Sequence, residues 1–188
     1  KDNVLIVTPQ KLWGTNNWRK MSYRMSFAER AYASKSALAQ YIINKVSTSV
    51  LILDSDLLFL TKIDDVLSKI SKFDITLFSS MHPIESWKKT KNVGIFSAGL
   101  IGFSSSGLVA LNWWKKSCFD KTRVNIFEGI YNEQKYLDYM IGSFNTEIIR
   151  DFGINLSATQ LSKKKIIYKK AHGWKIKNTN IKVRVFHN

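Results

Sequence analysis

The sequence predicts an α/β fold in which short apolar strands alternate with amphipathic helices. Residues 50–54 (VLILD) and 74–79 (DITLFS) each have the apolar run of a buried strand. Residues 26–45 repeat apolar side chains at helical spacing behind the S-x-x-E pattern of a capping box, Ser26 to Glu29. Such alternation indicates a layered architecture with ligands at the strand ends, and 188 residues suit a single domain over residues 1–188.

The other elements are expected in order along the chain. Where Gly, Pro, Asn and charged residues cluster, the sequence favours loops, and elsewhere the periodicity chooses between strand and helix. We expect a strand at 4–8, an ordered loop at 11–24, a short helix at 61–71, a polar loop at 82–92, a strand pair within 93–103, a helix at 108–118, helical spacing at 136–140, a strand entering a loop at 148–156, and strands at 165–168 and 181–186.

The charge of the chain is strongly positive, with 29 Lys and Arg against 14 Asp and Glu, a net charge of +15. This balance predicts an anionic partner such as nucleotide phosphates, a membrane surface, an acidic polymer or nucleic acid. No acidic residue follows Asp151, so the basic segment 157–188 holds much of the excess charge. No apolar run approaches the ~20 residues of a membrane-spanning helix. The single cysteine, Cys118, excludes an intrachain disulfide and favours a reducing, cytoplasmic compartment.

The most informative stretch is residues 50–60, VLILDSDLLFL, in which two aspartates interrupt an apolar run. In an extended chain, Asp54 and Asp56 point to one side and Ser55 points to the other. A buried carboxylate needs a compensating partner, and two oxygen ligands at a strand end suit a divalent cation. The alternative is a strand that ends in a polar turn, because D-x-D tripeptides are common.

Three other positions carry both a functional and a structural interpretation. Ser97, Ala98 and Gly99 interrupt an apolar strand, which indicates either a close approach of ligand to backbone or tight packing. Lys35 lies off the main apolar stripe of its helix, where it is either solvated or in contact with phosphate. Glu133 is either a helix cap or a group that faces the substrate.

Taken in order, these motifs resemble those of glycosyltransferases with the GT-A fold, in the glycogenin and galactosyltransferase group of bacterial polysaccharide synthesis. The resemblance runs from about Ser26 to His187. It consists of E-R-x-Y-x-x-K-x-x-L from Glu29, L-I-L-D-S-D-L-L-F from Leu51, F-S-A-G-L-I-G-F from Phe96, W-W-K-K-S-C from Trp113, E-Q-K-Y-L-D from Glu133, G-I-N-L from Gly153 and a terminal F-H.

The resemblance implies a GT-A-like, Rossmann-type mixed sheet flanked by helices. It also implies transfer of a hexose from a nucleotide-diphosphate sugar to the hydroxyl of a sugar or glycoconjugate acceptor, with retention favoured. The cofactor would be Mn²⁺ or Mg²⁺, held by Asp54, Asp56 and His187, with His172 as the second candidate histidine. The implied donor-binding residues are Lys35, Asp54, Ser55, Ala98, Gly99 and Asn155, and the implied catalytic residues are Glu133 and Gln134.

The sequence departs from the family pattern in two places. The family's N-A-G is Ser97-Ala98-Gly99 here, and its D-Q-K-Y-L-D begins with Glu133. The chain also enters its first apolar run almost at once after Lys1, so we expect that native residues precede it and carry part of the donor site.

Two other functions compete with catalysis. One is a degenerate transferase with an assembly role. The other is a non-catalytic nucleic-acid-binding domain, which the charge favours. No recognised nucleic-acid motif is present, so a nucleic-acid partner is not expected, whereas the basic segment is suited to peripheral contact with an anionic membrane.

Overall fold

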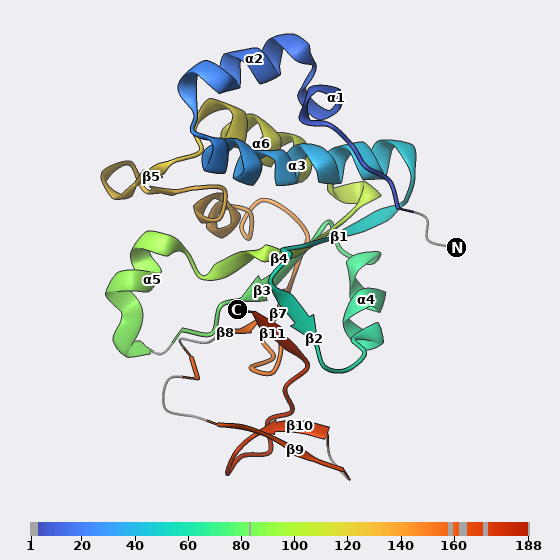
Figure 1. Ribbon diagram of the computed structural model, residues 1–188, viewed down its shortest axis with the longest axis vertical. Helices are drawn as coiled ribbons and strands as arrows, with labels where there is room; N and C mark the ends of the chain where they lie inside the picture. Colours follow the sequence, from blue (N-terminus) through green and yellow to red (C-terminus); the bar gives the residue numbers. More distant parts are fainter. Residues whose placement is uncertain (1–3, 83, 158–159, 162–164, 171–172, 188) are drawn as a thin grey trace.

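A four-stranded mixed sheet forms the centre of the protein (Figure 1). The computed structural model describes residues 4–82, 84–157, 160–161, 165–170 and 173–187. The strand order is β1-β4-β3-β7, and β4 runs antiparallel to both neighbours while β3 and β7 are parallel. The strands are β1 (Ser49–Leu53), β4 (Phe96–Ser104), β3 (Ile75–Ser79) and β7 (Thr146–Ile149). The mixed α/β class expected from the sequence is confirmed.

Helices cover both faces of this sheet. Alternate strand residues point to opposite sides, so both faces carry apolar side chains that pack against helices. Val50, Ile52, Ile75 and Leu77 face the core that contains α3 (Phe27–Lys45) and α6 (Leu108–Asp120). Leu51 and Phe78, each adjacent in sequence to one of these residues, face the core that contains α4 (Asp64–Ile70). The short α1 (Pro9–Trp13) and α2 (Thr15–Arg24) lie beyond α3 in Figure 1.

Helix α3 begins with the expected capping box. The Glu29 N–H donates to Ser26 Oγ (3.2 Å), and the Ser26 N–H donates to Glu29 Oε2 (2.7 Å). Both bonds satisfy backbone groups that the first helical turn leaves unpaired. Small buried residues, Ala33 and Ala37 among them, allow α3 to pack closely against its neighbours, and this packing sets the height of Lys35 above the sheet.

A second, three-stranded sheet brings the end of the chain beside the two aspartates. Its order is β2-β11-β8, from β2 (Leu57–Phe59), β11 (Val185–His187) and β8 (Leu156–Ser157). His187 is opposite Leu57 on one side and Ser157 on the other. The hairpin of β9 (Ile166–Lys169) and β10 (Gly173–Ile176) forms one end of the molecule (Figure 1).

The remaining elements are short and connect the main ones. They are α5 (Trp87–Val93), β5 (Val124–Asn125), β6 (Ile130–Tyr131) and the 3-10 helices η1 (Ile84–Ser86), η2 (Ser105–Gly107), η3 (Ile126–Glu128) and η4 (Lys135–Tyr139). None of the helices described, over residues 4–187 with the gaps given above, is long and apolar enough to cross a bilayer.

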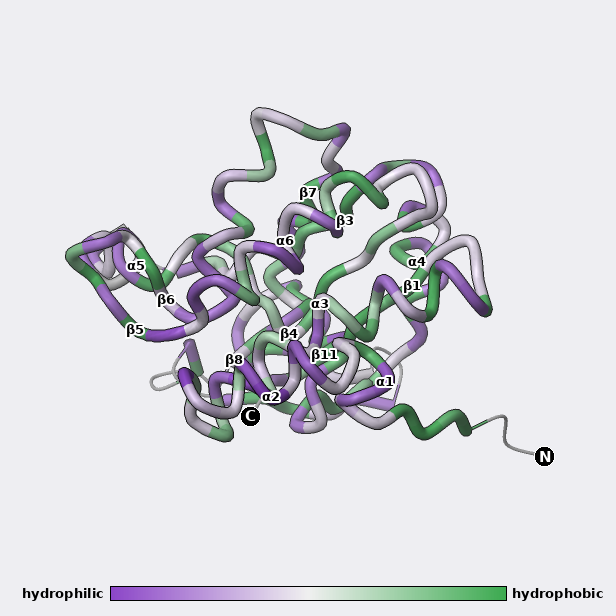
Figure 2. Tube along the Cα trace, turned by 90° about the horizontal axis from the view of Figure 1, so that it is seen from above, coloured by the Kyte–Doolittle hydropathy of each residue, from purple (hydrophilic) through white to green (hydrophobic). Residues whose placement is uncertain are grey.

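Several expected elements are wrong, and each error has a physical reason. Residues 4–8 form no strand, because no other strand pairs with them. Val4, Leu5 and Ile6 are exposed, and Figure 2 shows this segment as a hydrophobic stretch of the trace beside the N-terminus. Residues 11–24 are helices rather than a loop, since Pro9 begins α1 and Gly14 (φ 75°) separates α1 from α2. Most of the expected loop at 82–92 is η1 and α5.

Two further expectations need correction. The strand pair expected within 93–103 is one continuous strand, β4, because Gly99 and Gly102 are tightly packed rather than turning the chain. The helical spacing at 136–140 belongs to the 3-10 helix η4, which is too short for an amphipathic α-helix. The expected strands at 50–54, 74–79 and 165–168 and the helices at 26–45, 61–71 and 108–118 are confirmed within a few residues at their ends.

Candidate metal centre

Asp54, Asp56 and His187 come together where β1 passes into β2. Each offers one ligand atom, and the three atoms lie within 4.8 Å of one another. The Asp54 N–H still bonds to the Gly99 carbonyl (2.8 Å), so β1 continues to this point before the chain turns. The side chains of Asp54 and Asp56 are 30% and 47% exposed. They are therefore neither splayed apart nor sealed in the core, and a cation from solvent can reach them.

His187 is oriented by a second residue. Its Nδ1 lies 2.7 Å from Asn155 Oδ1, and an amide oxygen only accepts, so Nδ1 carries the proton. That tautomer leaves the lone pair on Nε2, which lies 3.3 Å from Asp56 Oδ1. Asn155 is buried and has a left-handed backbone conformation (φ 61°), one that asparagine tolerates better than most residues. Such a bond is the usual way in which proteins orient a metal-binding imidazole.

Gly99 allows the two sides of the site to meet. A Cβ at this position would lie 2.6 Å from Asp54 Oδ2 and 2.6 Å from His187 Cε1. Its φ is not in the left-handed region, so the requirement for glycine is a matter of space rather than of backbone conformation. The sequence predicted a close approach at Ser97-Ala98-Gly99. In the structure, the side chains of Asp54, directly after β1, and His187, in β11, approach the backbone of β4 at Gly99.

Lys35 links the site to the interior of the protein. Its Nζ lies 2.7 Å from Asp54 Oδ1, 2.9 Å from Glu133 Oε1 and 3.5 Å from the Ala98 carbonyl. Burial alone would lower the pKa of Lys35, but the carboxylates of Glu133 and Asp54 outweigh burial and raise that pKa. Lys35 thus remains charged and holds Asp54 in place, so it is not the solvated surface charge that was one of its two interpretations from the sequence.

Glu133 and Gln134 are adjacent in sequence but differ in environment. Glu133 is 4% exposed, directs its carboxylate at Lys35, and accepts a bond from Trp114 Nε1 on its backbone carbonyl (2.9 Å). Gln134 bridges the backbone by accepting from the Ala98 N–H (3.4 Å) and donating to the Val93 carbonyl (2.9 Å). Its side chain also lines a cleft, whereas Glu133 is enclosed.

The cleft begins at His187 and has a volume of about 260 Å³. Ser97, Gln134, Asn155 and His187 line it, and so do residues that the sequence did not predict for the site, namely Ser80, Tyr131, Ser157 and Gln160. Gln160 crosslinks this wall, because its amide accepts from the Ser157 N–H (2.7 Å) and donates to the Ser80 carbonyl. No sequence motif marks Ser80, Tyr131, Ser157 and Gln160, because they come from three separate segments.

Two other expected positions, Ala98 and Ser55, lie close to this centre. Ala98 is buried under Lys35, and Ser55 is exposed in the turn between the aspartates. His82 lines the cleft. His172, the alternative histidine, lies outside the described residues. The exposed Asp65 pairs with Arg184. The Arg184 guanidinium also contacts Asp151 (3.3 Å), and these contacts hold the start of β11.

Comparison with known proteins adds no relative. The chain matches no protein-family model, and a search of curated proteins finds no match. The function of the site therefore has to be argued from its donor atoms, charges and shape.

Proposed function

We propose that this chain is a metal-dependent glycosyltransferase of the GT-A fold, which moves a hexose from a nucleotide-diphosphate sugar to an acceptor hydroxyl in surface polysaccharide or glycoconjugate synthesis. The observation that carries the proposal is the convergence of Asp54 and Asp56 on His187, which itself lines a polar cleft. The motif order from Ser26 to His187 gives the reaction class. The free thiol of Cys118 supports a cytoplasmic location.

The donor atoms fit Mn²⁺ best and Mg²⁺ second. Two carboxylates suit hard cations, and a neutral imidazole favours a first-row transition metal over Mg²⁺. The bond from His187 to Asn155 and the ion pair from Asp54 to Lys35 fix two of the three ligands before an ion arrives. A bound ion would neutralise the charge that develops on the departing diphosphate.

The residues around the ligands have separate roles in this proposal. Lys35 holds Asp54 through their ion pair and adds positive charge beside the diphosphate. Gln134, with its side chain on the cleft, contacts the sugar or the acceptor. Glu133 is enclosed and bonded to Lys35, so it positions Lys35 and does not touch the substrate. Of the two residues that the resemblance implied to be catalytic, Gln134 therefore contacts the substrate and Glu133 has a positioning role.

Metal binding provides the first test, since it does not depend on knowing the substrate. We expect Mn²⁺ titration, followed by electron paramagnetic resonance, to show one site that Asp56→Asn weakens at least tenfold. Asp64→Asn removes the same charge from the exposed first turn of α4 and should leave the affinity unchanged. Equal losses in both variants would mean that Mn²⁺ responds to overall charge rather than to this site.

The second test is calorimetry with a panel of UDP- and GDP-sugars, with and without Mn²⁺. The proposal expects donor binding that requires the metal and is lost in Asp56→Asn. Turnover of the bound donor separates an active transferase from a degenerate one, because a degenerate enzyme would bind without hydrolysis or transfer. Full donor turnover by Asp56→Asn would refute the assigned metal role.

A further inference from the structure

The end of the molecule opposite α1 and α2 is a small antiparallel sheet that we name the basic meander, formed by residues 165–170 and 173–182 (Figure 1). Beyond the β9–β10 hairpin, the chain turns at Asn178 and returns along β10. The Val183 N–H then bonds to the Trp174 carbonyl (2.9 Å), and the Ile176 N–H bonds to the Ile181 carbonyl (3.0 Å). Ile176 and Val183 are buried beside Leu156, so the meander is anchored to the body.

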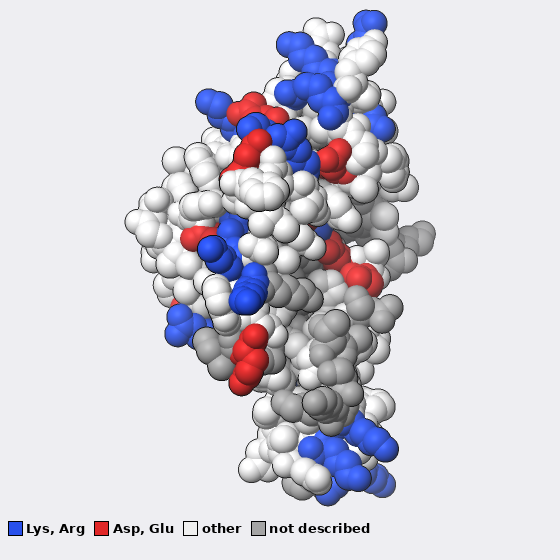
Figure 3. Space-filling model, turned by 90° about the vertical axis from the view of Figure 1, so that its left-hand side faces the viewer, with Lys and Arg blue, Asp and Glu red and all other residues white. Residues whose placement is uncertain are grey.

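Lysines of the meander have no acidic counterparts. No Asp or Glu occurs after residue 151, and within the described part of the chain no ion pair joins a lysine of the meander to a carboxylate. The lysines concerned are Lys165, Lys169, Lys170, Lys175, Lys177 and Lys182. Figure 3 shows Lys and Arg, but no Asp or Glu, at the lower end of the face that it presents. The positive charge of this surface is therefore uncompensated.

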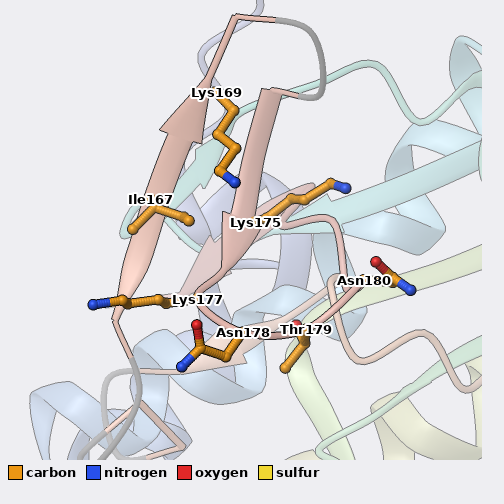
Figure 4. Close-up of a pocket in the computed structure, with 7 residues that line it drawn as sticks. All are labelled: Ile167, Lys169, Lys175, Lys177, Asn178, Thr179 and Asn180. Carbon is orange, nitrogen blue, oxygen red and sulfur yellow. The ribbon is translucent and has the colours of Figure 1, made fainter.

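One face of the hairpin is a shallow basic hollow of about 610 Å³. Ile167, Lys169, Lys175 and Lys177 line it, together with the turn at residues 178–180. Figure 4 shows Lys169 extending across the hairpin between its strands, whereas Lys177 extends outward. The side chains of these four residues share one face because alternate residues of a strand point to the same side. Residues 167 and 169 are two apart along one strand, and residues 175 and 177 are two apart along the other.

The opposite face carries a pair of exposed aromatic residues. Tyr168 and Trp174 are opposite each other in the register, with ring centroids 5.3 Å apart and planes at 56°. They are 60% and 37% exposed, and they lie next to the lysines in sequence. Each ring packs against its partner, so the pair exposes amphipathic edges rather than two flat faces on which a nucleobase would stack.

We propose that the basic meander docks edge-on against bilayers rich in anionic lipids, so that the lysines of one face and the aromatic pair of the opposite face both reach the headgroups. Tyr and Trp side chains are enriched at membrane–water interfaces, where their rings lie at the headgroup level. Lysines spread over a broad, shallow surface match the diffuse negative charge of such a leaflet, which attracts nearby basic segments. The proposal depends only on this surface and holds whether or not the metal centre is a transferase site.

Vesicle sedimentation with the whole chain tests the proposal. Vesicles of equal parts phosphatidylglycerol and phosphatidylcholine should bind the protein at low salt, and vesicles of phosphatidylcholine alone should not. Lys169→Gln combined with Lys175→Gln should weaken binding roughly 30-fold, since each lysine near an anionic surface is worth about 1 kcal/mol. Trp174→Ala should weaken binding further, and its effect should persist at high salt, where screening reduces the contribution of the lysines.

The matched control is Lys45→Gln combined with Lys72→Gln, which removes the same charge from exposed positions on the body. This control should bind vesicles within twofold of the unaltered chain. An equal loss in control and meander variants would overturn the proposal, because binding would then reflect net charge alone. Absence of vesicle binding would also overturn it. If the meander variants instead weaken binding to poly(U) while vesicles are not bound, the surface is a nucleic-acid site.

Discussion

The basic meander is connected to the metal centre by the few residues that lead into β11. Charged side chains are paired at the metal centre and unpaired in the described part of the meander. At the metal centre, Asp54 and Glu133 share Lys35, and Asp56 lies against His187. In the meander, no lysine has a carboxylate partner within the described residues. The first arrangement is compact and half-buried, while the second is spread over an exposed surface.

This difference has a physical consequence for the ligands that each region suits. Charges that are paired and partly buried are held in fixed positions and are screened little by salt, as recognition of a small ion requires. Exposed charges without partners keep their side-chain freedom and attract any anionic surface, but salt weakens that attraction. Substitutions in the two regions should therefore differ in their effects on stability, and four predictions follow this contrast from the largest effect to the smallest.

Lys35→Met should cause the largest loss, about 3 kcal/mol of unfolding free energy, because it leaves the carboxylate of Glu133 buried without a cation. Urea denaturation at neutral pH measures this loss. Lys115→Met is the control, since Lys115 is also half-buried but bonds to the neutral Gln40 amide (2.7 Å), and it should cost only about 1 kcal/mol. Adding Glu133→Gln to Lys35→Met should restore part of the stability. Equal losses of unfolding free energy in Lys35→Met and Lys115→Met would contradict the prediction that the ion pair with Glu133 distinguishes Lys35.

Gly99→Ala should come next, with a cost of about 1–3 kcal/mol and at least a tenfold loss of Mn²⁺ affinity. The added methyl group would overlap Asp54 Oδ2 and His187 Cε1 and push the two ligands apart. Thermal unfolding and Mn²⁺ titration measure the two effects. Gly142→Ala is the matched control, because a Cβ at that position has no atom within 4 Å. Unchanged Mn²⁺ affinity in Gly99→Ala would argue against a site between these residues.

Asp65→Asn should have a smaller effect, below about 1 kcal/mol, since its pair with Arg184 is exposed. Hydrogen bonding to Arg184 lowers the pKa of Asp65. A lowered pKa means that the stabilisation is present at neutral pH and is lost as pH falls below about 4 and passes the folded-state pKa. Denaturation of the variant and the unaltered chain should therefore differ at pH 7 and converge in acid. A difference that grows in acid would contradict this assignment.

Lys169→Gln combined with Lys175→Gln should have the smallest effect on stability, within about 0.5 kcal/mol in either direction, because neither lysine pairs with a carboxylate among the residues that the structure describes. The same urea experiment applies, with added salt as a second variable. A loss above about 1 kcal/mol would show that these side chains stabilise the hairpin, in which case weaker vesicle binding by this variant could reflect unfolding.

Much of the core could be predicted, and the reason is local. The strand of residues 50–54 and the helix of residues 26–45 carry their periodicity and caps in their own residues, and both are confirmed. Residues 4–8 have an equally good strand pattern but form none, because a strand also needs a neighbour. Residues 11–24 and 82–92 were expected as loops from their composition, yet packing and caps make most of them helical.

The candidate site was predicted in part. The D-S-D spacing alone indicated that Asp54 and Asp56 share a side, and the terminal histidine came from motif order. The separate environments of Glu133 and Gln134 could not be predicted, since neighbouring residues in sequence carry no signal of which one is enclosed. Gln160 and Tyr131 were missed for a similar reason, because they join the cleft only through contacts between distant segments.

By itself, the sequence determined the α/β class, the paired aspartates at a strand end and the excess of lysine after residue 151, because each depends on residues close together in the chain. Only the tertiary structure decided that Lys35 pairs with both Asp54 and Glu133, that Asn155 orients His187 and that Gly99 leaves room for both sides of the site. These contacts join segments separated by up to a hundred residues, and which of them form is set by the packing of α3, β4 and β11 together.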